Sequence, residues 1–289
     1  MDGIIIVNKE KDMTSRDVVN IACKVLNTKK IGHTGTLDPI ATGVLVLCVN
    51  KATKLVDLLT SEEKEYVAEV KLGMHTSTLD IEGEVLNEEP YVIQKDKLVE
   101  ILNSFVKTYM QEVPIYSSVK VGGRKLYEYA RNNEKVTLPK KEVTIKKIEL
   151  LAYDENTFTF KVLVSKGTYI RSLIRDIATK LSTYGTMTDL IRTRNGSFRL
   201  EDAISIDELK NGSFEIKSMR NFLDAKVVEI TSDIATKVFN GHKLEIDDVS
   251  HYILFVLKDK DVALYKKDGN YYKAYKVFNN SWKTNIFSV

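Results

Sequence analysis

Residues 32–43 read Gly-His-Thr-Gly-Thr-Leu-Asp-Pro-Ile-Ala-Thr-Gly, and this composition predicts a shaped loop rather than a helix or a central strand. Glycine adopts backbone conformations that are closed to other residues, and Pro39 removes a backbone donor and pushes Asp38 towards an extended conformation. The apolar run 44–49 follows at once and is typical of a buried strand. A loop anchored to a core strand is where a fold usually places its chemistry, so Asp38, the only acid in the loop, is the first candidate site residue.

The same loop allows a plainer interpretation and excludes two others. An Asp-Pro pair is common in simple turns, and the pair by itself favours a turn over a site. A phosphate-binding loop is excluded because no Gly-Lys-Ser/Thr follows at the required spacing. The glycine spacing also excludes a dinucleotide-binding fingerprint.

Length and composition bound the class of protein. The chain has 289 residues, enough for one large domain or for a large and a small one, and its 43% hydrophobic and 29% charged residues are ordinary for a soluble globular protein. No stretch approaches the roughly 20 apolar residues of a membrane span, and residues 1–8 lack the basic start of a signal peptide. We therefore expect a cytoplasmic protein with no membrane partner.

Cysteines and histidines give no indication of a metal site. Cys23 and Cys48 form no paired motif, and without a secretion signal we expect both thiols to be reduced. The four histidines are scattered and share no metal-ligand spacing with the cysteines. The sequence therefore predicts no metal and no organic cofactor.

Hydrophobic periodicity predicts a chain that mixes helices and strands. Thr14 and Asp17 form a capping-box pattern ahead of an amphipathic helix. Residues 66–72 alternate in polarity, which places Tyr66 on the inward face of a strand. The acidic connection 80–89 is predicted to be a solvated loop. The predicted strands are 3–8, 44–49, 66–72, 143–151 and 157–164, and the predicted helices are 15–27, 52–59, 95–109 and one with Thr168 as its N-cap.

The helix after Thr168 carries a cation in an unusual place. Helical spacing puts Arg171 in the first turn, where the helix dipole disfavours a positive charge by roughly 0.3–1 kcal/mol. A carboxylate partner is the simplest reason for an arginine there, and we choose Asp38 as that partner. An exposed arginine in a surface ion pair is the alternative, and spacing alone does not exclude it.

Charge is concentrated in one segment. The whole chain has a net charge of only +3, but residues 120–147 hold nine Lys or Arg against three Glu, a local excess of six. Tyrosines are interleaved with these cations, and such a mixture can contact phosphates and stack on bases. A solvated, charged helix on a long insertion is the alternative.

The pattern of predicted elements changes near Glu229. Short strands are predicted at 252–257, 262–265 and 271–278, with hairpin-like connections between them. We therefore expect a domain at 1–228, with a basic insertion at about 110–142, and a small β-rich domain at 229–289.

At this point several blocks carry a resemblance. The 32–43 loop, followed by Ala-Thr-Lys at 52–54, resembles the signature of the TruB family of tRNA pseudouridine synthases, and so do the Lys-x-Tyr block ending at Tyr66, the Gly-Thr-Tyr-Ile-Arg block at 167–171 and the segment 190–198. The chain departs from the family at 8–12, where Asn-Lys-Glu-Lys-Asp replaces the usual Lys-Pro-x-Gly. The implied fold is α+β: a mixed, largely antiparallel sheet flanked by helices, plus a C-terminal domain that resembles the PUA type.

The resemblance also implies roles for particular residues. Asp38 would be the nucleophile, adding to C1′ of the ribose or C6 of the base, and these two alternatives stay open. Arg171 would pair with Asp38, and Tyr66 would stack on the target base and serve as a candidate base; a tyrosine tied into the core is its alternative. The implied substrate-binding residues are His33, Lys54, Tyr169, Leu190, Lys120, Arg124 and Lys125, although Leu190 is equally compatible with plain core packing.

The implied activity is isomerisation of a uridine to pseudouridine at position 55, in the T-arm loop of tRNA, after the base has been flipped out. We expect a monomer that needs neither a guide RNA nor a protein partner. A non-catalytic tRNA-binding or tRNA-folding protein that uses the same surface is the alternative from another class. A relative that works with a guide RNA is a third hypothesis, and it ranks low because such relatives carry longer extensions.

Overall fold

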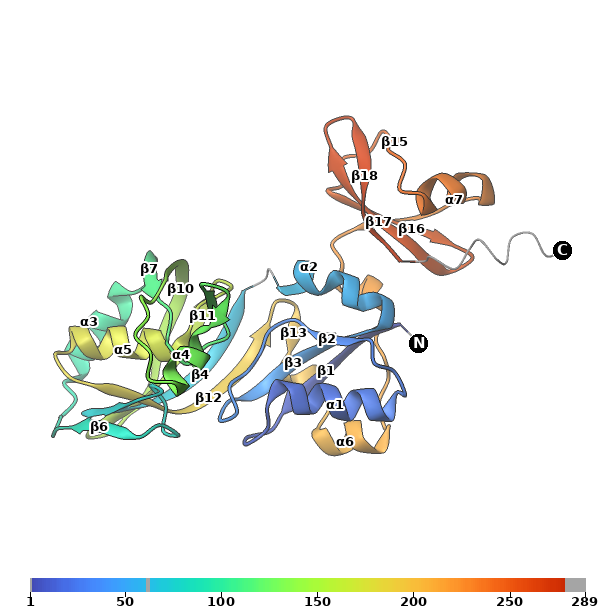
Figure 1. Ribbon diagram of the computed structural model, residues 1–289. Coiled ribbons are helices and arrows are strands. Elements are labelled where there is room, and N and C mark those ends of the chain that lie inside the picture. Colours follow the sequence, from blue (N-terminus) through green and yellow to red (C-terminus); the bar gives the residue numbers. More distant parts are fainter. Residues whose placement is uncertain (1, 61–62, 279–289) are drawn as a thin grey trace.

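The computed structural model describes residues 2–60 and 63–278, which form two domains, each built on its own sheet (Figure 1). The strands of the large sheet are β1 (Gly3–Lys9), β2 (Ile31–His33), β3 (Thr42–Val49), β4 (Lys64–Leu72), β7 (Thr108–Glu112), β10 (Lys140–Tyr153), β11 (Thr157–Val164), β12 (Gly185–Asn195) and β13 (Phe198–Arg199). Their order is β1-β3-β12-β4-β11-β10-β7, with β2 on β3 and β13 on β12.

Strand β12 joins two halves of this sheet. It pairs antiparallel with β4 along most of its length, and parallel with β3 at Ile191 and Arg192. The remaining neighbours in the large sheet are antiparallel. The predicted mixed, largely antiparallel sheet is therefore confirmed.

Helices cover each half of the sheet separately. The helices of the large domain are α1 (Ser15–Val25), α2 (Val56–Thr60), α3 (Lys95–Ser104), α4 (Leu126–Arg131), α5 (Ile170–Lys180) and α6 (Ile206–Asn211). Helices α1 and α6 pack on the half that holds β1 and β3, and α3 and α5 pack on the half that holds β4, β10 and β11 (Figure 1). Two small ribbons complete the domain: β5 (Met74–Thr76) with β6 (Val85–Glu88), and β8 (Lys120–Val121) with β9 (Arg124–Lys125).

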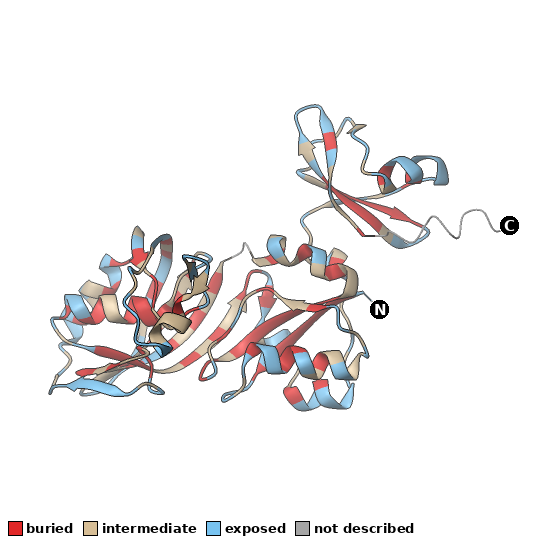
Figure 2. Cartoon of the chain, in the orientation of Figure 1, coloured by how far each residue is buried: buried red, intermediate tan, exposed pale blue. Residues whose placement is uncertain are grey.

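Burial follows the predicted alternation in β4. Tyr66, Ala68, Val70 and Leu72 are buried, and the residues between them are more exposed. Figure 2 shows the same concentration of buried residues along the central strands of both halves. Because side chains alternate between the two faces of a strand, Tyr66 is held on the inward face. The inward orientation of Tyr66 is confirmed.

Two predicted helix boundaries were wrong. The predicted helix 95–109 ends at Ser104, because residues 108–112 leave it to pair with β10 as strand β7. Thr168 is not the N-cap of α5: the cap position is Tyr169, and the Thr168 hydroxyl instead donates to the Ser165 carbonyl. In the first case a tertiary pairing outweighs a local preference, and in the second a local bond to Ser165 occupies the Thr168 hydroxyl.

The small domain is a five-stranded sheet with one helix. Its elements are β14 (Lys226–Glu229), α7 (Ser232–Phe239), β15 (Leu244–Glu245), β16 (Tyr252–Leu257), β17 (Lys260–Asp268) and β18 (Tyr271–Val277). The sheet begins at Lys226, before the expected boundary at 229, because β14 crosses over through α7 to pair parallel with β16. Residues 279–289 of the expected domain lie outside the described part of the chain.

Contacts tie the small domain to the large one. The Arg220 guanidinium bonds Asp259 and Asp261 at the start of β17, and one hydrophobic cluster includes Leu59 of α2 and Leu254 of β16. Across the described ranges, no helix is long and apolar enough to cross a membrane.

Candidate functional site

The predicted pair of Asp38 and Arg171 is present. Arg171 Nε donates to Asp38 Oδ2 at 2.9 Å, across 133 residues of sequence. The Arg171 side chain is 6% exposed and the Asp38 side chain 38% exposed, so the carboxylate remains accessible while the cation behind it is buried. A charge-assisted bond of this kind fixes the orientation of the carboxylate.

The other nitrogens of Arg171 bind two further segments. Nη1 donates to the Thr78 carbonyl at 2.9 Å and Nη2 donates to the Tyr116 carbonyl at 3.1 Å. The guanidinium is therefore fully engaged, which explains why an arginine is tolerated in the first turn of α5 despite the helix dipole.

A second carboxylate reaches the same guanidinium. Asp80 Oδ2 lies 3.7 Å from Arg171 Nε, and the Asp80 side chain is 7% exposed. The prediction of a solvated loop at 80–89 was therefore wrong for Asp80. The turn that carries it bonds β12 near its start, where the Ile81 amide donates to the Met187 carbonyl and the Met187 amide donates to the Leu79 carbonyl. The sequence did not predict the contact of Asp80 with Arg171, because the several acids of segment 80–89 are typical of a charged, solvent-exposed loop.

A cavity of about 200 Å³ opens beside Asp38. Four of the predicted site residues line it together with Asp38: Tyr66, Tyr169, Leu190 and Arg171. Tyr66 and Leu190 come from the neighbouring strands β4 and β12 and are both largely buried. Burial also raises the pKa of the Tyr169 hydroxyl, which favours its neutral form. The wall also includes the cations Lys64, Lys166 and Arg192, so aromatic and apolar surface that suits a flat ring lies beside positive charge.

Buried side chains hold the loop that carries Asp38. The Ser15 hydroxyl accepts from the Leu37 amide at 2.8 Å and donates to its carbonyl at 3.2 Å. Lys9 Nζ donates to the Pro39 carbonyl at 3.1 Å, and burial lowers the Lys9 pKa to about 8, so the amine is still mostly charged at neutral pH. Segment 8–12 therefore supports the loop, because Lys9 packs under it.

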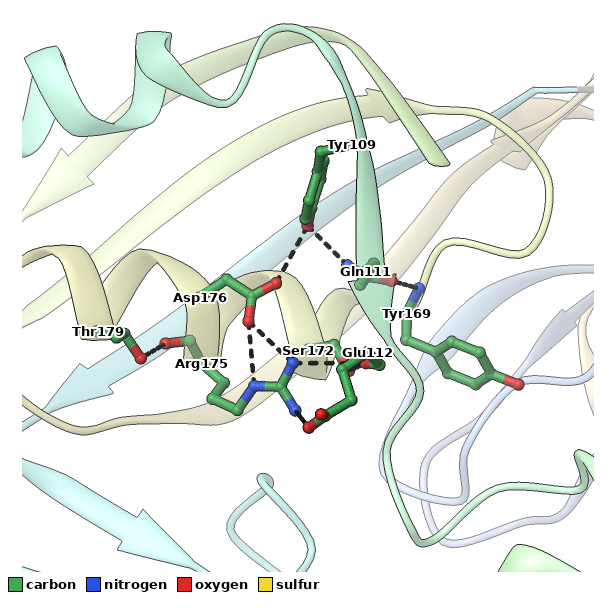
Figure 3. Close-up of polar contacts among 8 residues, drawn as sticks. All are labelled: Tyr109, Gln111, Glu112, Tyr169, Ser172, Arg175, Asp176 and Thr179. Atoms are coloured by element: carbon green, nitrogen blue, oxygen red, sulfur yellow. Dashed lines mark hydrogen bonds and ion pairs between the residues drawn. The ribbon is translucent and has the colours of Figure 1, made fainter. Parts of the chain in front are cut away.

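A buried network positions the start of α5 (Figure 3). Gln111 Oε1 accepts from the Tyr169 amide at 2.8 Å, which satisfies one of the helix-terminal donors that Thr168 does not cap. Gln111 Nε2 donates to the Tyr109 hydroxyl, and this hydroxyl donates in turn to Asp176. The Tyr169 ring points away from this network in Figure 3. Gln111 was not predicted, because its partner is 58 residues away.

Two more bonds in Figure 3 fasten α5 to β7. The Ser172 hydroxyl donates to the Glu112 carbonyl at 2.8 Å, and Arg175 Nη1 donates to Glu112 Oε1 at 3.1 Å. Strand β7 therefore fixes the first turns of α5, from which Arg171 projects.

His33 lines a second cavity, which also has Asp38, Arg16, Tyr127 and Arg131 in its wall. Its Nδ1 accepts from the Gly35 amide at 3.3 Å, and burial lowers its pKa, which favours the neutral imidazole. Asp38 is thus shared by two cavities with different linings.

The predicted basic insertion is an excursion between β7 and β10, which we define as residues 113–139. It contains β8, β9 and α4 and is closed by a bond from the Val113 amide to the Pro139 carbonyl. Lys120 is exposed, Lys125 Nζ donates to the Tyr127 hydroxyl, and both nitrogens at the tip of Arg124 bond Glu134. None of these three cations lines either cavity beside Asp38.

Lys54 lies away from the cavity. It belongs to the 3₁₀ turn Asn50–Leu55 and donates to the Val277 carbonyl of β18. Lys54 lines neither cavity beside Asp38 and contacts the small domain, and its role in substrate binding stays a prediction. Within residues 2–60 and 63–278, no group of three His, Cys, Asp or Glu side chains is placed to hold a metal ion.

Known structures share this arrangement of domains. A chain in the crystal structure of a Cbf5-Nop10-Gar1 complex superposes with a TM-score of 0.69 and 27% identity, covering 96% of this chain and 85% of the other. A chain in the structure of an H/ACA RNP bound to a substrate RNA gives a TM-score of 0.68 and 26% identity, with the same coverage. The protein therefore shares its fold with the matched chains of these two complexes, one of which is bound to a substrate RNA.

Sequence comparison narrows the class to one family. A family model described as TruB family pseudouridylate synthase (N terminal domain) matches residues 23–170. A tRNA pseudouridine synthase B from Caldanaerobacter subterraneus is 42% identical over 243 residues, covering 83% of this chain and 85% of that protein. One from Bacillus pumilus is 40% identical, covering 92% and 93%. The chain belongs to the TruB family of pseudouridylate synthases.

Proposed function

We propose that this protein converts a uridine in the T-arm loop of tRNA, at position 55, to pseudouridine. The single observation that carries the proposal is the accessible Asp38 carboxylate, bonded from behind by the buried Arg171 and flanked by a cavity with aromatic and apolar walls. The relatives named tRNA pseudouridine synthase B support tRNA as the substrate. The reaction would take place in the cytoplasm, on tRNA alone, without a guide RNA or a protein partner.

The proposed chemistry needs one nucleophile and a pocket. Asp38 adds to C1′ of the ribose or to C6 of the uracil, and the bond from C1′ to N1 breaks. C5 then bonds to C1′, the bond to Asp38 breaks so that the carboxylate is regenerated, C5 loses its proton and N1 takes one up. Tyr66 stacks on the uracil and is positioned to assist removal of the C5 proton. Arg171 holds Asp38 at a fixed angle to the reacting carbon, a contribution that orientation makes to many enzymes.

The target base must leave the loop to reach Asp38. Extruding a stacked base costs a few kcal/mol, which aromatic and phosphate contacts offset. We assign these contacts to His33 and the second cavity, and to the excursion with Lys120, Arg124 and Lys125. The small domain, which we propose to be PUA-like, would extend the RNA-binding surface.

Mapping pseudouridine on an unmodified tRNA transcript tests the proposal. The protein alone should introduce one pseudouridine at position 55, and a transcript with cytidine at that position should stay unmodified. Asp38→Asn should lower turnover by several orders of magnitude, as removal of a nucleophile commonly does, and should leave tRNA affinity within a few-fold of wild type. Turnover that survives Asp38→Asn would exclude the nucleophile, and a wild type that binds tRNA without modifying it would favour a tRNA-folding role.

A further inference from the structure

Arg192 is the largest fully buried side chain in the described part of the chain, with 1% of its surface exposed. Its hydrogen bonds go to backbone carbonyls: Nε donates to Val44 at 2.7 Å, Nη2 to Gly35 at 3.0 Å and Nη1 to Thr36 at 3.3 Å. Burying a guanidinium is unfavourable unless its donors are satisfied. A lysine could not satisfy three carbonyls in this planar arrangement, because its single nitrogen lacks the fork.

The three carbonyls mark both ends of the loop that carries Asp38. Gly35 and Thr36 open the loop, and Val44 follows it in β3. The backbone of Arg192 is also a sheet partner of Gly43, so one residue holds the loop by its main chain and its side chain. A Cβ atom on Gly43 would lie 2.3 Å from the Arg192 carbonyl oxygen, and φ at Gly43 is +101°, so glycine is required for this close approach.

The opposite neighbour of Arg192 is Tyr66. The two residues pair across β12 and β4, and both line the cavity beside Asp38. Arg192 therefore sets the distance between the loop and the strand that supplies the aromatic wall. Between the ends that Arg192 holds, Ser15 and Lys9 bond Leu37 and Pro39. The residues on either side of Asp38 are thus held by side chains from other segments.

We propose that Arg192 is a positioning residue for Asp38. Its guanidinium fixes the path of residues 35–44, and through that path it fixes the Asp38 carboxylate relative to Arg171 and to the cavity. The proposal rests on the proposed function for its effect on turnover, but its effect on the loop is independent of any activity.

Arg192→Lys and Arg192→Gln test this role. The matched controls are Arg194→Lys and Arg194→Gln, on the same strand, where the side chain bonds the nearby Gly196 carbonyl. Three quantities are measured for each folded variant: the single-turnover rate at saturating tRNA, the dissociation constant for tRNA, and hydrogen exchange at the amides of residues 34–38.

A positioning role predicts a specific combination of results. Misplacement of a reacting group by about 1 Å can cost about 10²-fold in rate, so Arg192→Gln should lose about that much and Arg192→Lys about tenfold. Both should keep tRNA affinity within threefold and show faster exchange at residues 34–38. The Arg194 variants should match wild type in all three.

Several outcomes would overturn the proposal. One is a folded Arg192→Lys or Arg192→Gln protein with wild-type exchange at residues 34–38. Another is lost tRNA affinity with an unchanged saturating rate, which would make Arg192 an RNA contact. If wild type itself makes no pseudouridine, the proposed function fails, while the exchange measurement still decides the role of Arg192 in the loop.

Discussion

At the scale of single residues, the site depends on Arg171. Its guanidinium bonds the Asp38 carboxylate, the Thr78 carbonyl and the Tyr116 carbonyl, so it connects the loop to the turn before β6 and to the excursion. RNA bound to the excursion would therefore act close to the group that orients Asp38. Under the proposed function, a contact of this kind would link RNA binding to the orientation of Asp38.

Replacing the Arg171 guanidinium by an amine should show how much of its effect on Asp38 comes from orientation and how much from its positive charge. Arg171→Lys keeps a cation near Asp38 but cannot bond all three oxygens, so we expect turnover to fall about 10²-fold with tRNA affinity nearly unchanged. Single-turnover kinetics and a filter-binding assay measure the two effects. Arg175→Lys is the control, because Arg175 lies one turn further along α5 and bonds Glu112 and Asp176 instead. Equal losses in both variants would show that α5, rather than Arg171, had been disturbed.

The sequence predicted part of this site and missed the rest for a physical reason. Asp38 was identified from its loop, and Arg171 from a cation placed against a helix dipole, and these two are bonded as expected. Asp80 and Arg192 were missed because burial turned a surface-like acid and an ordinary strand arginine into fully engaged groups. Whether a charged side chain is buried depends on segments that are distant in the sequence, so the local sequence pattern cannot predict it.

At the scale of elements, α1 begins with the predicted capping box. The Thr14 side chain accepts from the Asp17 amide at 3.1 Å, and Asp17 Oδ2 accepts from the Thr14 amide at 2.9 Å. This cap also fixes Ser15, the next residue, which bonds Leu37 in the catalytic loop. The start of α1 is therefore part of the support of the site.

Removing that cap should lower stability measurably. Thr14→Ala should destabilise the large domain by about 1 kcal/mol, a shift of about 2–4 °C in its midpoint of thermal unfolding. Thr231→Ala is the matched control, because Thr231 is the N-cap residue of α7 but makes no side-chain capping bond. A Thr14→Ala protein with an unchanged midpoint would show that solvent replaces the cap without loss.

Elements were predictable where local signals sufficed. The capping box placed the start of α1 correctly, and alternation placed the inward face of β4. The start of α5 was misplaced because its terminal amide is capped by Gln111 from β7. The end of α3 was misplaced because residues 108–112 pair with β10 as strand β7 instead of continuing the helix.

At the scale of the whole molecule, charge is unevenly distributed. Lys120 is exposed at the surface of the excursion, whereas Arg124 is bonded to Glu134. Binding of a nucleic-acid backbone releases counterions in proportion to the cations that contact phosphates. The excursion therefore should determine the salt dependence of tRNA binding.

Neutralising Lys120, Arg124 and Lys125 together should weaken tRNA binding and flatten its salt dependence. Each lost phosphate contact should reduce the slope of log K against log salt by about 0.7–0.9, and Arg124→Gln alone should contribute least. Titrations at several salt concentrations measure the slope. Lys95→Gln, Lys97→Gln and Lys107→Gln combined, at exposed positions in and after α3, remove the same number of charges and control for net charge. Affinity and slope that both stay at wild-type values would make the excursion cations a merely solvated surface.

The central position of β12 has a consequence for biosynthesis. Until residues 185–195 leave the ribosome, the nascent chain holds two half-sheets, and β4 exposes the edge that later pairs with β12. Strand β3 is already paired with β1 and β2 and lacks only the short contact at residues 42 and 43. Asp38 belongs to one half and Arg171 to the other, and Leu190 and Arg192 of β12 line the cavity beside Asp38, so a polypeptide stalled before Gly185 lacks part of the wall of that cavity. Such open edges invite aggregation. Catalytic competence would thus be acquired late in translation, and chaperones that shield strand edges should favour its recovery.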